Sequence, residues 1–64
     1  MRQSNNLKEY RLKAGLTQKQ VANVLGMQCE DRLSHWEKGK SMPSIQNFLK
    51  LCKLYEVDPR MVYE

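Results

Sequence analysis

The chain has 64 residues, with 11 Lys or Arg against 7 Asp or Glu, and a net charge of +4 at pH 7. Its length predicts one domain, residues 1–64, with no room for a deep substrate cavity and a lid, which argues against an elaborate enzyme. The basic surplus favours a polyanionic partner. No stretch reaches the roughly 20 apolar residues of a membrane span, and the first residues lack an apolar signal core, so we expect a cytoplasmic protein without membrane contact.

The sequence has no residue pattern typical of a metal site or a catalytic site. The two cysteines, Cys29 and Cys52, form no C-x-x-C pair, and His35 is the only histidine, so neither a metal site nor a cofactor is predicted. Counting leaves a disulfide between the cysteines open, although two reduced thiols fit a cytoplasmic protein better. No nucleophile–base pair or phosphate-cradling glycine loop is present, so we predict no enzyme activity and no small-molecule substrate.

Turn signals divide the chain into five short helical segments, and no alternating β-branched run predicts a strand. The first segment covers about residues 6–14. The second covers about residues 17–25, where Thr17 and Gln20 have the spacing of a capping box. Gly26 ends this second segment, because glycine adopts the left-handed backbone that follows many helices.

The third segment covers about residues 29–38 and begins with Cys29 at the N-cap. Leu33 and Trp36, three residues apart, point into the core. This spacing leaves the opposite, polar face of the segment free for solvent or a partner.

The fourth and fifth segments complete the domain. The fourth, about residues 44–55, starts at Ser44, a good N-cap, and carries a wide apolar stripe. The fifth, about residues 58–63, has Asp58 as its cap and Pro59 in the first helical position. The apolar residues of this half that we expect in the core are Met42, Ile45, Phe48, Leu49, Cys52, Tyr55 and Met61.

The joint between the second and third segments carries the functional signal. Two helices that meet at a steep angle through a short turn form a helix-turn-helix, which can place its second helix in the major groove of DNA. The residues that carry a family resemblance are Leu16-Thr17-Gln18-x-x-Val21-Ala22-x-x-Leu25-Gly26, then Leu33-Ser34-x-Trp36-Glu37-x-Gly39-Lys40, and then Pro43-Ser44.

This ordered set resembles the lambda-repressor-like (Cro/repressor-type, XRE) helix-turn-helix family. The resemblance implies an all-α, compact five-helix DNA-binding domain with its helix-turn-helix at the second and third helices. It also implies sequence-specific binding of double-stranded DNA by a small transcriptional regulator, such as a repressor, with the third helix in the major groove. A dimer on a two-fold site would have to use the surface of this same domain, for example its fifth helix.

The resemblance assigns two sets of DNA contacts. The residues that match base-reading positions are Gln28, Glu30, Asp31, Arg32, Ser34 and His35. The residues that match phosphate-contacting positions are Arg11, Gln18, Lys19, Lys38 and Lys40. In related repressors, residues that match Arg11 and Glu37 also join the first helix to the third.

Two departures from the family pattern affect these assignments. Trp36 comes ten residues after Gly26, one more than in the common form, so we expect a longer turn, and which of residues 28–31 reach DNA stays open. Glu30 and Asp31 are acidic where phosphates approach. A carboxylate can accept a hydrogen bond from the cytosine amino group. It can equally interact with the positive end of the helix dipole, pair with Arg32 or bind a partner protein. The alternative function is therefore a protein-interaction module, such as an antitoxin or phage factor.

Overall fold

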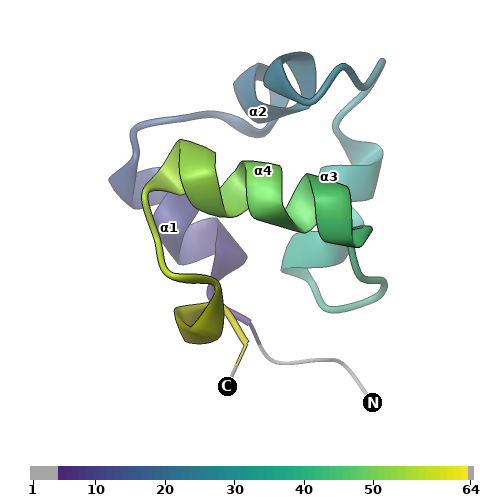
Figure 1. Ribbon diagram of the computed structural model, residues 1–64. Coiled ribbons are helices and arrows are strands. Elements are labelled where there is room, and N and C mark those ends of the chain that lie inside the picture. The colour runs from purple at the N-terminus through teal and green to yellow at the C-terminus, as the bar shows by residue number, and fades with distance from the viewer. Residues whose placement is uncertain (1–4, 64) are drawn as a thin grey trace.

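The computed structural model describes residues 5–63, which form four α-helices and one 3₁₀ turn (Figure 1). In chain order the elements are α1 (Leu7–Lys13), α2 (Gln18–Val24), α3 (Asp31–Glu37), α4 (Ile45–Tyr55) and η1 (Pro59–Met61). The predicted all-α class is confirmed, and the four helices begin and end within two residues of their predicted bounds. The predicted fifth helix is wrong, because residues 59–61 make a single 3₁₀ turn between the Asp58 cap and Val62.

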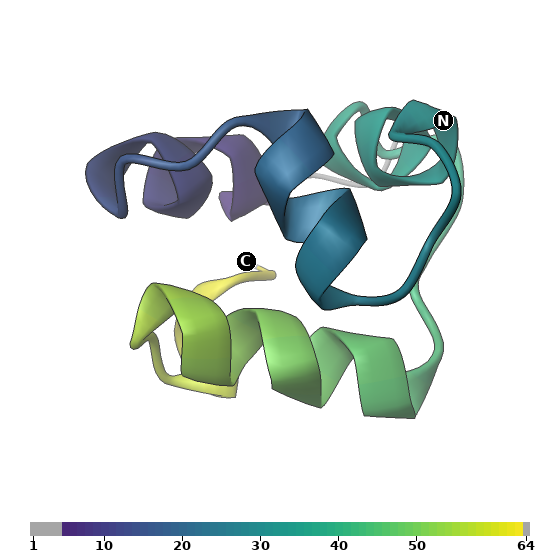
Figure 2. The same cartoon turned by 90° about the horizontal axis from the view of Figure 1, so that it is seen from above.

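The helices form two layers around one core. Seen from above, α4 lies on one side of the molecule and α1, α2 and α3 lie on the other (Figure 2). Each helix contributes a fully buried aliphatic side chain, and so does the segment after η1. These side chains are Leu7, Val21, Leu33, Leu51 and Val62. The core therefore holds α3 against the rest of the domain from one side only.

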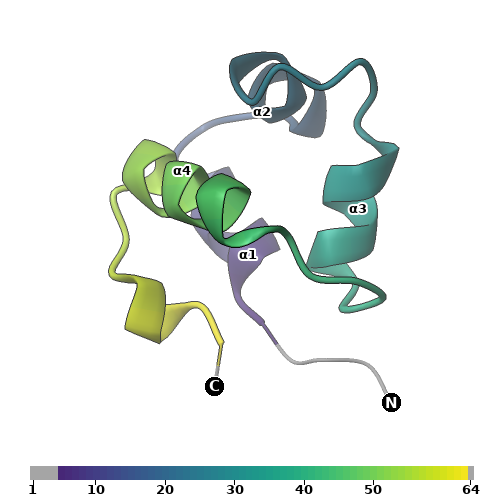
Figure 3. The ribbon, with the colours of Figure 1, turned by 45° about the vertical axis from the view of Figure 1, so that its right-hand side comes forward.

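The two ends of the described chain are bound to each other. The Asn6 amide donates to the Val62 carbonyl at 2.9 Å, and Asn5 and Tyr63 form an isolated antiparallel bridge. The Asn5 side-chain amide also donates to the Trp36 carbonyl at 3.0 Å. Figure 3 shows both ends below the helices. Asn5 thus supports the end of α3.

Several apolar residues that the sequence placed in the core are exposed. Ile45 is 70% exposed on α4, and its neighbour one turn on, Leu49, is 51% exposed. Met42 and Met61 are also exposed. Apolar residues surround most of α4, but only one arc of the helix, which carries Leu51, Cys52 and Tyr55, faces the core.

The two cysteines are free in the structure. Cys29 is exposed in the turn between α2 and α3, whereas Cys52 is buried on α4. Burial raises the pKa of the Cys52 thiol, and the nearby Asp58 carboxylate raises it further. Within residues 5–63, no helix has both the length and the apolar character that crossing a membrane requires.

Candidate nucleic-acid interface

The first helix of the helix-turn-helix, α2, begins with the predicted capping box. The Gln20 amide donates to the Thr17 hydroxyl at 3.1 Å, and the Thr17 amide donates to the Gln20 side-chain carbonyl at 2.8 Å. Val21 and Ala22 lie on the buried face of α2. The chain leaves α2 through Gly26, whose φ of +75° lies in the left-handed region that favours glycine.

The turn that follows is longer than the predicted one. The third helix begins at Asp31 with Glu30 at the N-cap, so the expected N-cap at Cys29 is wrong. Leu33 and Trp36 set the register of α3 from the core, and the additional length therefore falls in the turn. Gln28 precedes the helix as well, and it reaches the candidate interface from the turn rather than from α3.

The two faces of α3 differ sharply in burial. Leu33 is fully buried and Trp36 is 2% exposed, which confirms the predicted underside of the helix. Asp31 and His35, one turn apart, are exposed on the opposite face, and Ser34 beside them is partly exposed. The outer face of α3 is thus open along its whole length, as a groove-reading helix requires.

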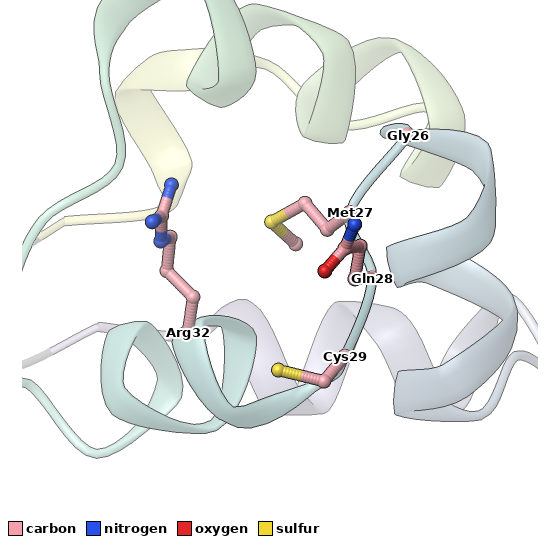
Figure 4. Close-up of a pocket in the computed structure, with 5 residues that line it drawn as sticks. All are labelled: Gly26, Met27, Gln28, Cys29 and Arg32. Carbon is pink, nitrogen blue, oxygen red and sulfur yellow. The ribbon is translucent and has the colours of Figure 1, made fainter.

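Arg32 occupies the edge of α3 that faces the turn. Its side chain lines an open hollow of about 370 Å³ together with Gly26, Met27, Gln28 and Cys29 (Figure 4). The guanidinium therefore lies on the same side of α3 as the turn residues. The hollow is open to solvent, so the side chains of Gln28 and Arg32 are accessible from outside the domain.

A second hollow, of about 350 Å³, lies between the turn and α2. Lys19 and Asn23 line it from α2, and Glu30 and Asp31 line it from the start of α3. The turn therefore brings a predicted phosphate contact, Lys19, to the same surface as the two acidic residues. Asp31 stands in the first turn of α3, where a carboxylate suits the positive end of the helix dipole.

A buried polar network joins the three helices behind this surface. Arg11 Nε donates to Glu37 Oε2 at 2.7 Å, so the predicted pair between α1 and α3 is confirmed. Arg11 Nη1 also donates to the Leu16 carbonyl at 2.8 Å. Gln18 Nε2 donates to Glu37 Oε1 at 2.9 Å, a bond that sequence reasoning missed. Glu37 thereby fixes the start of α2 against the end of α3.

Tyr55 of α4 lies close enough to this network for the charges of Glu37 and Arg11 to affect its pKa. Burial raises the pKa of the Tyr55 hydroxyl, the negative charge of Glu37 raises it further, and the positive charge of Arg11 opposes the rise. The hydroxyl is buried and has no hydrogen-bond partner among the described residues. Tyr55 thus lies near the ion pair without a hydrogen bond from its hydroxyl to either partner.

The predicted phosphate-contacting residues fall into two groups. Lys19, Lys38 and Lys40 are exposed, near the start of α2 and just after α3. By contrast, Arg11 is only 7% exposed, and Gln18 is partly buried and bonded to Glu37. The first group is free to meet a phosphate in this arrangement, whereas the side chains of the second group position the helices.

Two helices joined by a turn, with the second anchored from below and open above, define a helix-turn-helix protein. This chain belongs to the XRE-type, lambda-repressor-like helix-turn-helix family, whose profile, described as "Helix-turn-helix", matches residues 7–62. Domains of this family bind DNA and are typically non-enzymatic.

One solved structure extends this relationship. It is described as the crystal structure of "a putative DNA-binding protein from Bacteroides fragilis" and superposes with a TM-score of 0.82. The two sequences are 30% identical over 94% of this chain and 95% of that chain. Among curated proteins, no significant match to this chain was found.

Proposed function

We propose that this protein is a small transcriptional regulator that binds double-stranded DNA sequence-specifically, with α3 in the major groove. The observation that carries this proposal is the open outer face of α3, from Asp31 to His35, above a fully anchored underside. The major groove of B-DNA is about 12 Å wide and admits an α-helix. Family membership and the net charge of +4 support the same function.

The proposed contacts separate positioning from base recognition. Lys19, Lys38 and Lys40 contact phosphates on either side of the groove, joined by the backbone amide of Gln18 at the start of α2. The proposed base-reading residues are Gln28, Glu30, Asp31, Arg32, Ser34 and His35. A carboxylate from α3 accepts from a cytosine amino group, and Arg32 donates to guanine.

A homodimer on a two-fold DNA site fits the dimensions of the domain. Half-sites one helical turn apart are separated by about 34–36 Å. The Cα trace measures 27 × 23 × 20 Å, and side chains extend beyond it on each side. Two copies with their long axes along the DNA would therefore meet, and each would contribute one α3.

Selection of bound sites from a random duplex pool, followed by fluorescence anisotropy at several salt concentrations, tests the proposal. We expect a two-fold symmetric site and an affinity that falls by about 0.9 log units per log unit of salt for each phosphate contacted. Lys50→Ala serves as the control, because Lys50 lies on α4, in the layer opposite α3. Absence of binding even at low salt would contradict DNA binding and favour the protein-interaction alternative.

A further inference from the structure

A groove between the two layers of the molecule, at the end of α2 and along α4, plays no part in the proposed DNA contacts. It has a volume of about 240 Å³ and is lined by Val24 from the end of α2 and by Lys50, Lys53 and Leu54 from α4. Figure 2 shows the end of α2 approaching α4. The lining exposes almost only carbon atoms, and Val24 itself is 62% exposed. We call it the α2–α4 groove.

The two lysines give this apolar groove a charged rim. Lys50 and Lys53 are three residues apart and therefore neighbours on α4, a helix without any Asp or Glu. Among the residues that the structure describes, neither lysine forms an ion pair. Long lysine side chains place their methylene stems along apolar surface and keep the ammonium groups at its edge.

We propose that the α2–α4 groove binds an acidic segment of a partner protein. One apolar side chain of that segment inserts between Val24 and Leu54, and flanking carboxylates pair with Lys50 and Lys53. The volume suffices, because an apolar cavity of roughly 150 Å³ accommodates a benzene ring. Burial of the anchor supplies affinity, and the two charge pairs select an acidic partner over a basic one.

The same features argue against two other occupants. A DNA phosphate would satisfy the lysines but would leave the carbon walls of Val24 and Leu54 uncovered. A second copy that packed its own α4 here would oppose Lys50 and Lys53 with the same lysines, and like charges repel.

The groove also shares no residue with the proposed DNA contacts, and Val24 lies some distance along α2 from Gln18 and Lys19. Val24 is the last residue of a helix that begins at Gln18. At 1.5 Å per residue, this separation amounts to about 9 Å along the axis. The acidic segment and DNA would thus use separate residues of this domain, and binding of both would attach the partner protein to the DNA site that α3 recognises.

Nuclear magnetic resonance titration of the ¹⁵N-labelled protein tests the proposal directly. The probe is a short peptide of leucine and glutamate, and the two control peptides carry lysine in place of glutamate or serine in place of leucine. We expect the amide signals of Val24, Lys50, Lys53 and Leu54 to shift with the first peptide only. Shifts centred on α3 and the turn, equal shifts with all three peptides, or no shift at millimolar peptide would overturn the proposal.

Variants refine the test without disturbing the core. Val24→Ser should weaken binding of the acidic peptide about tenfold, because one valine side chain no longer contributes its burial. Lys50→Gln with Lys53→Gln should weaken it and reduce its salt dependence. Ile45→Ser is the matched control, since Ile45 is an exposed apolar residue of α4 outside the groove. Unchanged binding by Val24→Ser, or equal loss by Ile45→Ser, would refute the groove as the site, whatever the outcome of the DNA-binding experiments.

Discussion

The buried pair between Arg11 and Glu37 allows the sharpest prediction about stability. The side chains are only 8% and 3% exposed, and Glu37 accepts from both Arg11 and Gln18. Glu37→Gln keeps the shape of the residue but leaves the Arg11 guanidinium buried without a countercharge. Removal of one partner of a buried pair costs about 3–5 kcal/mol. A core of this size supplies only about 3–5 kcal/mol of net stability, so the free energy of unfolding of the variant should be close to zero and about half of it should be unfolded at 25 °C.

Urea and thermal unfolding followed by circular dichroism measure this effect. A loss of 3 kcal/mol corresponds to a decrease in Tm of roughly 12–24 °C in a domain of this length. The double variant Arg11→Met with Glu37→Met is the control, because it removes both charges and should recover much of the loss. The reasoning fails if Glu37→Gln melts within a few degrees of the parent protein, or if the double variant is as unstable as the two single losses added together.

Four further predictions concern the core, the DNA contacts and the cap of η1. Trp36→Ala should cost about 3–5 kcal/mol and abolish the cooperative unfolding transition, and a folded variant would contradict its place in the core. Arg32→Ala should weaken binding to the selected site more than binding to random duplex, whereas equal losses would make Arg32 a phosphate contact. Lys40→Ala should weaken binding to all DNA sequences alike. Anisotropy at several salt concentrations should then show a salt dependence reduced by the equivalent of about one phosphate contact. Hydrogen bonds from Arg60 lower the pKa of Asp58, so its stabilising effect is present above the unfolded pKa of about 3.9 and is lost as pH falls through the folded value. Asp58→Asn should therefore reduce the loss of stability between pH 5 and pH 2. If urea titrations at several pH values in this range show the same loss of unfolding free energy for the variant as for the parent protein, Asp58 does not have this role.

Local signals predicted most of the fold. The capping box at Thr17, the caps at Ser44 and Asp58, and the spacing of Leu33 and Trp36 all depend on residues a few positions apart. Such short-range patterns specify helices and their buried faces directly. They could not show that Pro59–Met61 makes only one 3₁₀ turn, because a cap and an N-terminal proline are common to long and short helices.

Features that depend on distant residues were harder to predict. The Arg11–Glu37 pair was available through the family resemblance, but the bond from Gln18 to Glu37 depends on how closely α2 meets α3. Exposure of Ile45 could not be read from α4, because apolar residues surround most of that helix and the sequence does not say which arc faces the core. The α2–α4 groove combines Val24 with residues 50–54 and has no signature within either segment.

The tie between Asn6 and Val62 has a practical consequence for redesign. Since the residues near the two termini already lie side by side, a short added linker could join them into a closed ring without moving any helix. New termini could then be opened in the exposed segment around Ser41 and Met42, between α3 and α4. Such a circular permutant would retain every helix while reversing the order in which its halves are synthesised.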